Sequence, residues 1–248
     1  MCSRFVLEKS RLRALLTSLG LSTEIADADS SHPADRYNIA PDSRITALRT
    51  TPEGLAAFYP RWGFTAAASA FDPGSALPAP RSLFTNARAE TLALKPTFRD
   101  AYRHRRCLVL ATGFYEWAKH GRARLPWLFR VHGSAPFAFA ALWENTPDGD
   151  TRVVTVTTTP NALMAPIHHR MPALLLTPEA CRAWLDPHAD EAALTALLAP
   201  IEGAAMTATP VSPRMNRADF NCPECLAPAI HGLSARDTTD GTTQEFLF

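Results

Sequence analysis

The chain has 248 residues, of which 46% are hydrophobic and 20% are charged, and its formal net charge is +1. These values are typical of a soluble globular protein, and so small a net charge means that any contact with DNA must come from a local basic patch. No apolar run approaches the length of a membrane span, and the charged residues between Glu8 and Arg13 exclude the apolar core of a signal peptide, so we expect a cytoplasmic protein with no membrane partner.

The first residues, Met1-Cys2-Ser3-Arg4, carry a candidate site. If an aminopeptidase removes Met1, Cys2 presents an amine and a thiol on adjacent carbon atoms. The amine can condense with an aldehyde to give a Schiff base, and the thiol can then close a five-membered thiazolidine ring. An internal cysteine cannot do this because its nitrogen is part of an amide. A cysteine at position 2 has no function in most chains, so this hypothesis needs support from the rest of the sequence.

The N-terminal part of the chain combines short elements with long loops. Ser10 can cap a helix from Arg11 to Leu19, which Gly20 ends. Residues 22–36 and 66–81 lack periodicity and are expected to be loops. Extended segments are expected over Tyr37 to Pro41, Ile45 to Arg49 and Leu55 to Tyr59.

The segment around residue 100 is expected to be helical and strongly basic. Pro96 is expected to end one short helix, and Phe98 to Tyr102 to form a further helical turn. A solvated helix face is the favoured interpretation of the basic cluster unless other features of the chain point to DNA. Its members are Arg99, Arg103, His104, Arg105 and Arg106.

The following part of the chain is rich in short β-branched and aromatic runs separated by Gly, Pro and Asp turns. Helices are expected over Pro178 to Leu185 and Asp190 to Leu198. Because helices and strands do not alternate regularly, we expect an α+β fold: a mainly antiparallel, curved or barrel-like sheet with peripheral helices, in a single domain over residues 1–233. The expected strands span Cys107 to Leu110, Phe114 to Ala118, Trp127 to Val131, Phe137 to Glu144, Arg152 to Thr158 and Met206 to Val211.

Glu116 lies in the motif Gly113-Phe114-Tyr115-Glu116-Trp117. Alternation along a strand places Phe114 and Glu116 on the same face. A carboxyl group among aromatic neighbours is often desolvated, which raises its pKa and suits it to proton transfer. A surface-facing glutamate on an edge strand is the alternative, and the sequence alone favours neither.

The segment Ile167-His168-His169-Arg170-Met171-Pro172 holds further candidates. If it is extended, His168 and Arg170 share a face, where the histidine could transfer protons and the arginine could bind a phosphate. A loop histidine with a structural hydrogen bond is the alternative. His168 and His169 are not expected to bind a metal together, because adjacent residues on a strand point to opposite faces.

No cofactor or metal site is expected. Cys222-Pro223-Glu224-Cys225 has no further ligands at suitable spacing, so we interpret it as structural. The Walker loop, the dinucleotide fingerprint and the nucleophile elbow are absent. An odd count of five cysteines in a reducing compartment argues against a disulfide framework.

A set of motifs in fixed order resembles one known family, the SOS-response-associated peptidases (SRAP), which process abasic sites in DNA. The resemblance implies a protein that shields abasic sites in single-stranded DNA, and an autopeptidase that releases its own N-terminal residue. The motifs are Met1-Cys2-x-Arg4-Phe5, Tyr37-Asn38-Ile39-Ala40-Pro41, Arg61-Trp62-Gly63, Asn86-Ala87-Arg88-Ala89-Glu90-Thr91, Arg106-Cys107-Leu108-Val109, Gly113-Phe114-Tyr115-Glu116-Trp117, Ala141-Leu142-Trp143-Glu144, Ile167-His168-x-Arg170-Met171-Pro172 and Pro223-Glu224-Cys225-Leu226.

The resemblance also implies roles for particular residues. Cys2 is expected to be the nucleophile that traps the sugar aldehyde of the abasic site. Asn86 would orient the Cys2 amine or the opened sugar, and Glu116 would be the acid/base for ring opening and Schiff-base formation. His168 would assist proton transfer, including strand scission or reversal of the link. Residues expected to contact DNA are Arg4, Arg88 and Arg170, which would bind phosphates, and Trp62, which would stack near a kink.

The chain departs from the family pattern at two places. Ser3 replaces the usual glycine after the cysteine, which restricts the backbone there. Phe64-Thr65-Ala66-Ala67-Ala68 replaces the usual apolar-Pro-x-Trp segment after Gly63. Two other functions stay open: a cysteine peptidase acting on other proteins through Cys2, Glu116 and His168, and a plain single-stranded-DNA-binding module.

Residues 234–248 are polar and of low complexity and are expected to be a flexible tail. Its last five residues resemble the Gln-x-x-Leu-Phe peptide by which many bacterial replication and repair proteins bind the sliding clamp. Gln244, Leu247 and Phe248 would make the contacts, as an extended segment in an apolar pocket. Packing of Phe246 to Phe248 against the domain is the alternative. We otherwise expect a monomer.

Overall fold

The computed structural model describes residues 2–23, 35–65 and 83–229. The expected tail, the expected loop over residues 66–81 and most of the loop over residues 22–36 lie outside the described residues. No helix among the described residues is long and apolar enough to cross a membrane.

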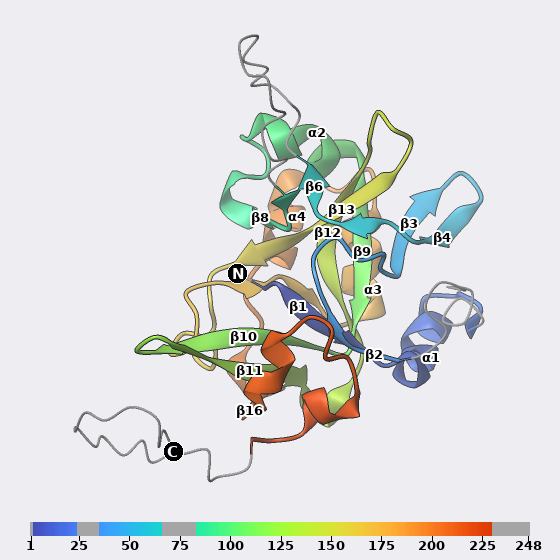
Figure 1. Ribbon diagram of the computed structural model, residues 1–248. Helices are drawn as coiled ribbons and strands as arrows, with labels where there is room; N and C mark the ends of the chain where they lie inside the picture. The colour runs from blue at the N-terminus through green and yellow to red at the C-terminus, as the bar shows by residue number, and fades with distance from the viewer. Residues whose placement is uncertain (1, 24–34, 66–82, 230–248) are drawn as a thin grey trace, which may run out of the picture.

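Two sheets form the centre of the molecule (Figure 1). The first is antiparallel throughout, with the strand order β16-β11-β10-β1-β2. Its strand β1 carries the residues that follow Cys2 and lies between β10 and β2. The bounds are β1 Arg4–Leu7, β2 Arg36–Ile39, β10 Gly113–His120, β11 Ala123–Val131 and β16 Met206–Pro210.

The second sheet has the order β14-β13-β12-β9-β3-β4, and three further strands pair beside this path. Most of its pairs are antiparallel, but β5 and β8 pair with β13 in parallel. A separate two-stranded sheet joins β6 (Phe64–Thr65) and β7 (Leu83–Phe84). The second sheet comprises β3 Ala47–Thr51, β4 Gly54–Phe58, β5 Arg61–Trp62, β8 Asn86–Arg88, β9 Arg106–Ala111, β12 Phe137–Asn145, β13 Thr151–Thr158, β14 Met171–Pro172 and β15 Leu174–Leu175.

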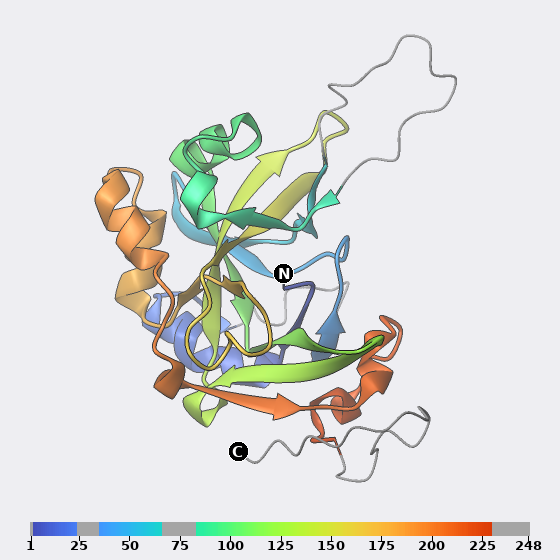
Figure 2. The same ribbon diagram turned by 90° about the vertical axis from the view of Figure 1, so that its left-hand side faces the viewer.

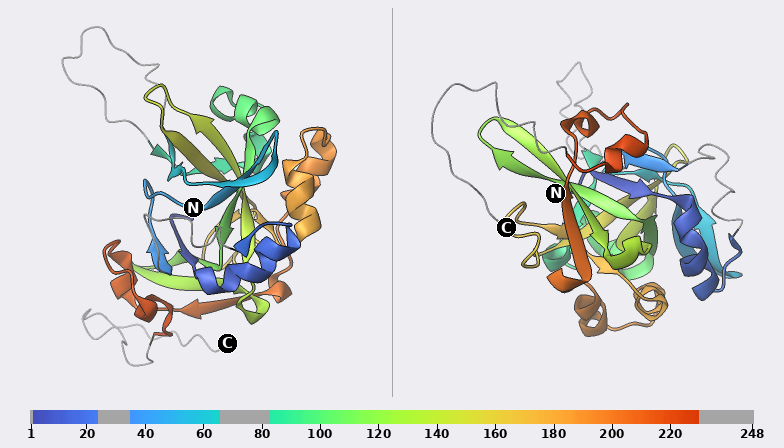
Figure 3. Two further views of the ribbon diagram at one scale, coloured as in Figure 1. Left: turned by 90° about the vertical axis from the view of Figure 1, so that its right-hand side faces the viewer. Right: turned by 90° about the horizontal axis from the view of Figure 1, so that it is seen from below.

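Helices lie at the periphery of the two sheets (Figures 2 and 3). The architecture therefore confirms the predicted α+β class with mainly antiparallel strands, although neither sheet closes into a barrel. The α-helices are α1 Lys9–Ser18, α2 Pro96–His104, α3 Pro178–Leu185 and α4 Glu191–Leu197. Short 3-10 helices are η2 Ala89–Thr91, η3 His132–Ser134, η4 Gly203–Ala205, η5 Pro213–Asn216 and η6 Pro223–Leu226.

Two predicted helix ends are wrong. Glu8, not Ser10, is the N-cap of α1, and its side chain forms no capping hydrogen bond. Pro96 begins α2 instead of ending a helix, because proline has the backbone angle of the first turn and no N–H to satisfy there. The predicted stop at Gly20 is correct: its φ is 79°, and the Leu21 N–H donates to the Leu16 carbonyl at 2.9 Å, as in a Schellman motif.

Phe5 of β1 lies between the two sheets and joins their cores. Its ring meets Trp62 edge-on at a centroid distance of 5.2 Å and Phe139 at 5.7 Å. All three side chains are buried. Burying each such ring stabilises the fold by about 2–3 kcal/mol, so the residues next to Cys2 are held firmly in place.

The outer face of the first sheet is covered by residues 211–229, which we call the C-terminal strap. Met215 and Cys225 of the strap pack with Val6 and Tyr115 in a second, smaller apolar cluster. Asn38 anchors the strap by donating from Nδ2 to three of its backbone carbonyl groups, each at 2.9 Å. The acceptors are Met215, Arg217 and Phe220.

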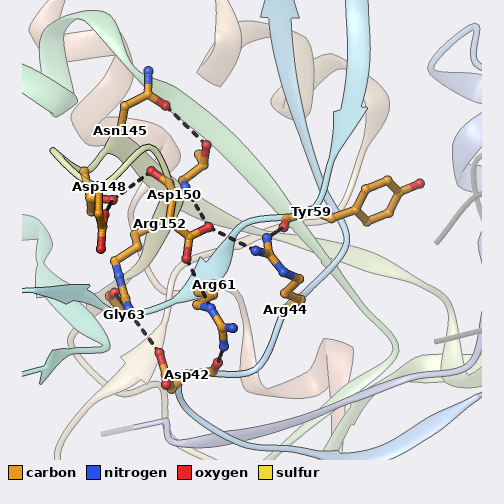
Figure 4. A network of polar contacts seen from close by, with 11 residues as sticks. Asp42, Arg44, Tyr59, Arg61, Gly63, Asn145, Asp148, Asp150 and Arg152 are labelled. Carbon is orange, nitrogen blue, oxygen red and sulfur yellow. Dashed lines mark hydrogen bonds and ion pairs between the residues drawn. The ribbon is translucent and has the colours of Figure 1, made fainter. Parts of the chain in front are cut away.

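A polar network fixes β5 to the turn between β12 and β13 (Figure 4). Asp150 forms ion pairs with Arg44 at 3.2 Å and with Arg61 at 3.1 Å. Arg152 donates to the Asp42 carboxylate and to the Gly63 carbonyl, each at 3.0 Å. These contacts bracket Trp62, which lies beneath Phe5, and so support the position of the N-terminal strand.

Candidate active site

Strand β13 is the scaffold of the candidate site. Strand β8 runs parallel to it, with Asn86 opposite Thr155 and Arg88 opposite Thr157. Because side chains alternate along a strand, Thr155 and Thr157 point to the same face as Asn86 and Arg88. Cys2 reaches this face from the start of β1, where the Asn86 Nδ2 donates to its carbonyl oxygen at 2.8 Å.

Thr155 fixes the orientation of the Asn86 side-chain amide. The Asn86 Oδ1 lies 3.1 Å from the Thr155 hydroxyl, which donates because the carbonyl oxygen can only accept. The amide nitrogen is thereby directed toward Cys2. The resemblance assigns Asn86 to the Cys2 amine or the sugar, whereas the hydrogen bond formed is with the Cys2 carbonyl. Thr155 is a site residue that the sequence interpretation misses, since nothing local marks it.

The Cys2 thiol is buried, with 2% of the residue exposed. Burial raises the pKa of this thiol well above its usual range, and the nearby Glu116 carboxylate raises it further. Sγ lies 3.5 Å from the Arg4 carbonyl oxygen. The thiol is therefore held protonated in this conformation.

Glu116 is buried on β10, not surface-facing, with 1% of the residue exposed. Strand alternation places it on the face of Phe114, as expected. Burial raises its pKa from 4.5 to about 7. A carboxyl group with such a pKa can both accept and donate a proton near neutral pH.

His168 lies beside Glu116, with 3.9 Å between Nδ1 and the nearer carboxylate oxygen. Burial lowers the pKa of His168, which favours the neutral ring. His168 and His169 are not part of a strand, and their rings stack with centroids 4.5 Å apart. The argument from alternating strand faces therefore does not apply to this pair, because these two residues do not lie in a strand.

Arg170 is buried and bound within the protein. It donates bidentately to Glu90 at 2.6 and 2.9 Å, and to the Thr157 carbonyl at 2.5 Å. Its backbone N–H lies 3.1 Å from the His168 Nδ1. The Glu90–Arg170 pair thus holds the backbone that positions His168. Hydrogen bonding to Arg170 lowers the pKa of Glu90. Glu90 stands within the motif after Asn86, but spacing alone does not reveal its partner.

The other residues expected to contact DNA differ in exposure. Trp62 is fully buried, and its indole N–H donates to the Thr85 carbonyl at 3.0 Å, so no surface of the ring is available for stacking here. Arg4 is half-buried, and its Nε has no hydrogen-bond partner among the described residues. Arg88 is exposed. Its position beside Asn86 suits a contact with the substrate backbone.

No group of three or more His, Cys, Asp or Glu side chains is arranged to hold a metal ion within the described ranges. Cys225 is buried and its thiol lies 3.1 Å from the Phe220 carbonyl oxygen, inside the C-terminal strap. The Cys222–Cys225 motif therefore lies away from the residues gathered around Cys2, on the outer face of the first sheet.

Comparisons with known proteins agree over nearly the whole chain. A family model described as "SOS response associated peptidase (SRAP)" matches residues 1–218. The chain is 33% identical over 232 residues to the abasic site processing protein YoqW of Bacillus subtilis (strain 168), covering 91% of this chain and 99% of that protein. It is 31% identical over 190 residues to the abasic site processing protein YedK of Escherichia coli (strain K12), covering 75% and 79% of the two chains.

Solved structures share the fold. A protein from Bacteroides thetaiotaomicron superposes with a TM-score of 0.74 at 22% identity, over 92% of this chain and 100% of the other. A phage-related protein from Bordetella bronchiseptica superposes with a TM-score of 0.65 at 25% identity, over 85% and 94%.

Proposed function

The chain belongs to the SOS response associated peptidase family, and we propose that it recognises abasic sites in single-stranded DNA and links to them covalently through Cys2. Relatives over most of its length are named abasic site processing proteins. The observation that carries the proposal is the buried Glu116 carboxyl, with a pKa raised to about 7, beside Cys2 and His168.

The chemistry begins with removal of Met1, which frees the Cys2 amine. The amine nitrogen adds to the aldehyde carbon of the ring-opened sugar, and the aldehyde oxygen leaves as water to give an imine. The thiol sulfur then bonds to the imine carbon while its proton ends on nitrogen, which closes a thiazolidine without any change of oxidation state. Glu116 can exchange the protons of these steps, and the neutral His168 ring can relay them.

Two arginines are assigned to the substrate strand, and two further residues support the site. Arg88, exposed next to Asn86, binds a phosphate, and Arg4 adds a second contact at the mouth of the site. Arg170 already binds Glu90, so its role is to hold His168 in place. Trp62 supports the site from beneath, and stacking on DNA would require its release from Phe5.

Cys2→Ala should abolish the adduct with an abasic site in single-stranded DNA. We expect the wild-type protein to give a band on a denaturing gel that survives boiling. Cys2→Ser keeps the amine and should leave at most an imine that borohydride can trap. Mass spectrometry of the N-terminus is the control, because a retained Met1 would block the amine. A boiling-resistant adduct from Cys2→Ala would contradict the mechanism.

Cleavage of other proteins by Cys2 is the less favoured function. A cysteine peptidase needs a thiolate at neutral pH, whereas burial raises the pKa of the Cys2 thiol. Autocatalytic release of the N-terminal residue stays within the proposal as an earlier step, which cannot use the Cys2 amine because this nitrogen is an amide until Met1 leaves. Strand scission at the abasic site would follow imine formation, with the same carboxyl and imidazole groups.

We also propose that residues Gln244 to Phe248 bind the sliding clamp, which would concentrate the protein at cytoplasmic replication forks. A fluorescent peptide spanning Thr238 to Phe248 should bind purified clamp saturably, and substituting Leu247 and Phe248 by Ala should remove binding. Absence of saturable binding by the unaltered peptide would refute this partner.

A further inference from the structure

The β10–β11 hairpin extends beyond the first sheet as a two-stranded arm. Strand β1 pairs with β10 only as far as Tyr115, and β16 pairs with β11 only from Trp127 onward. Between these points the two strands pair with each other, up to His120 opposite Ala123. Figure 1 and the right-hand view of Figure 3 show the hairpin projecting from the body of the molecule. We call residues 117–126 the basic arm.

The basic arm carries cations and no carboxylate. No Asp or Glu occurs between Trp117 and Leu128. The charged side chains of the arm are exposed, and the ion pairs formed among the described residues include none of them. The basic residues of the arm are Lys119, His120, Arg122 and Arg124.

Two of these cations face each other. Lys119 is directly opposite Arg124 in the ladder, so both side chains leave the same face of the arm. Like charges in this position destabilise a hairpin, and an isolated two-stranded ribbon is only marginally stable. The arm therefore carries a charge arrangement that opposes its own folding and that a bound polyanion would relieve.

The arm is braced and lies beside the candidate site. Asn216 of the strap accepts a hydrogen bond from the Trp117 indole N–H at 2.6 Å and donates to the Arg124 carbonyl at 3.3 Å. Lys119 follows Glu116 by three residues on the same strand, about 10 Å along it, and its side chain leaves the opposite face, the one that carries Trp117. Lys119 is also among the charges that act on His168.

We propose that the basic arm is a binding surface for the phosphodiester backbone of DNA on one flank of the lesion. The inference rests on the proposed function, which places the lesion at Cys2. The surface itself contributes no reacting group. Neighbouring phosphates of a strand leaving the site would lie against Lys119 and Arg124, and Arg122 at the tip would extend the contact.

The test is the salt dependence of binding to an undamaged single-stranded oligonucleotide, followed by fluorescence anisotropy. The variant Lys119→Gln/Arg122→Gln/Arg124→Gln should lower the steepness of log K against log salt by about 0.7 for each phosphate that the arm no longer neutralises, and by about 2 if there are three such phosphates. The same titration with duplex DNA shows whether the arm binds single-stranded or double-stranded DNA. If the slope changes with only one of the two, that form is the one that the arm binds. An unchanged slope with both forms refutes the proposal.

The matched control is Lys95→Gln/Arg99→Gln/Arg103→Gln on and beside α2, which removes the same three charges from other exposed positions. Its slope should stay at the wild-type value, and an equal reduction would show that only net charge matters. The arm variant should melt at the same temperature as the wild type or higher, because the repulsion between Lys119 and Arg124 is gone. A lower melting temperature would contradict the proposal.

A third measurement separates binding from chemistry. At saturating abasic DNA, the variant Arg122→Gln/Arg124→Gln, which keeps Lys119 and its effect on His168, should form the adduct at the wild-type rate, since these two residues supply no reacting group. A slower rate at saturation with an unchanged salt slope would overturn the inference. The two proposals can fail separately, because the salt titration uses undamaged DNA. If the wild-type protein binds through the arm but forms no adduct with abasic DNA, only the proposed function is refuted.

Discussion

Glu116 shows how burial converts an ordinary side chain into a reactive group. It lies inside the first sheet between aromatic neighbours, and desolvation raises its pKa to about 7. The same desolvation destabilises the folded protein when the carboxyl group is ionised. A group retained at such a cost is a candidate for function, and here Cys2 and His168 lie beside it.

The pH dependence of stability should report this group. Between pH 4.5 and about 7 the folded protein keeps a proton that the unfolded chain has released, so stability present at low pH is lost as the pH rises through this window. The loss should reach about 3 kcal/mol. The Glu116→Gln variant has no carboxyl group to ionise at this position. Relative to the wild type, its free energy of unfolding should therefore rise by this amount between pH 4 and pH 8, as measured by urea denaturation. Parallel curves for the two proteins would mean that Glu116 ionises normally.

Single residues could be predicted from sequence where their chemistry is intrinsic. Cys2 is a candidate because of its position, and Glu116 because of its aromatic motif. Arg170 and Trp62 could not be placed, because their exposure depends on partners distant in sequence. The partner of Arg170 is Glu90, and Trp62 packs against Phe5. An arginine drawn into a bidentate pair and an arginine facing solvent have the same local sequence.

At the scale of elements, local signals predict strands and helices but not their pairing. Helix α3 has the predicted bounds, Pro178–Leu185, because Thr177 caps it and Pro178 begins it. Strands β12 and β13 differ from their predicted ranges by one residue at an end. Nothing local indicates that β8 pairs with β13 in parallel, although this pairing brings Asn86 to Thr155 and thus to Cys2.

The basic cluster around α2 illustrates the same limit. Sequence density alone makes residues 99–106 the most basic stretch, yet Arg105 pairs with Asp100, and Arg106 is buried with four backbone carbonyl acceptors. The basic arm is harder to identify from the sequence, because Gly121 and Ala123 separate its basic residues. Only the register of the hairpin shows that Lys119 faces Arg124.

At the scale of the whole molecule, the C-terminal strap links the end of the described chain to its beginning. It covers the outer face of the first sheet, and its residue Asn221 accepts hydrogen bonds from the backbone N–H groups of Tyr37 and Asn38 in β2 at 2.7 and 2.9 Å. Because β2 pairs with β1, these contacts extend to the strand that carries Cys2. The strap therefore supports the site indirectly, through β2 and β1.

Asn38→Ala should test how much of the fold depends on this link. The change leaves three backbone carbonyl groups of the strap without their shared donor, in a largely buried position. Leaving such acceptors unpaired should lower the free energy of unfolding by about 2–4 kcal/mol in urea denaturation. Asn216→Ala is the matched control: this asparagine also forms hydrogen bonds between the strap and the first sheet, but it is exposed, so its removal should cost under about 1 kcal/mol. Equal decreases for the two variants would show that the strap is held by its apolar contacts alone, and that Asn38 does not tie the C-terminal part of the fold to β2.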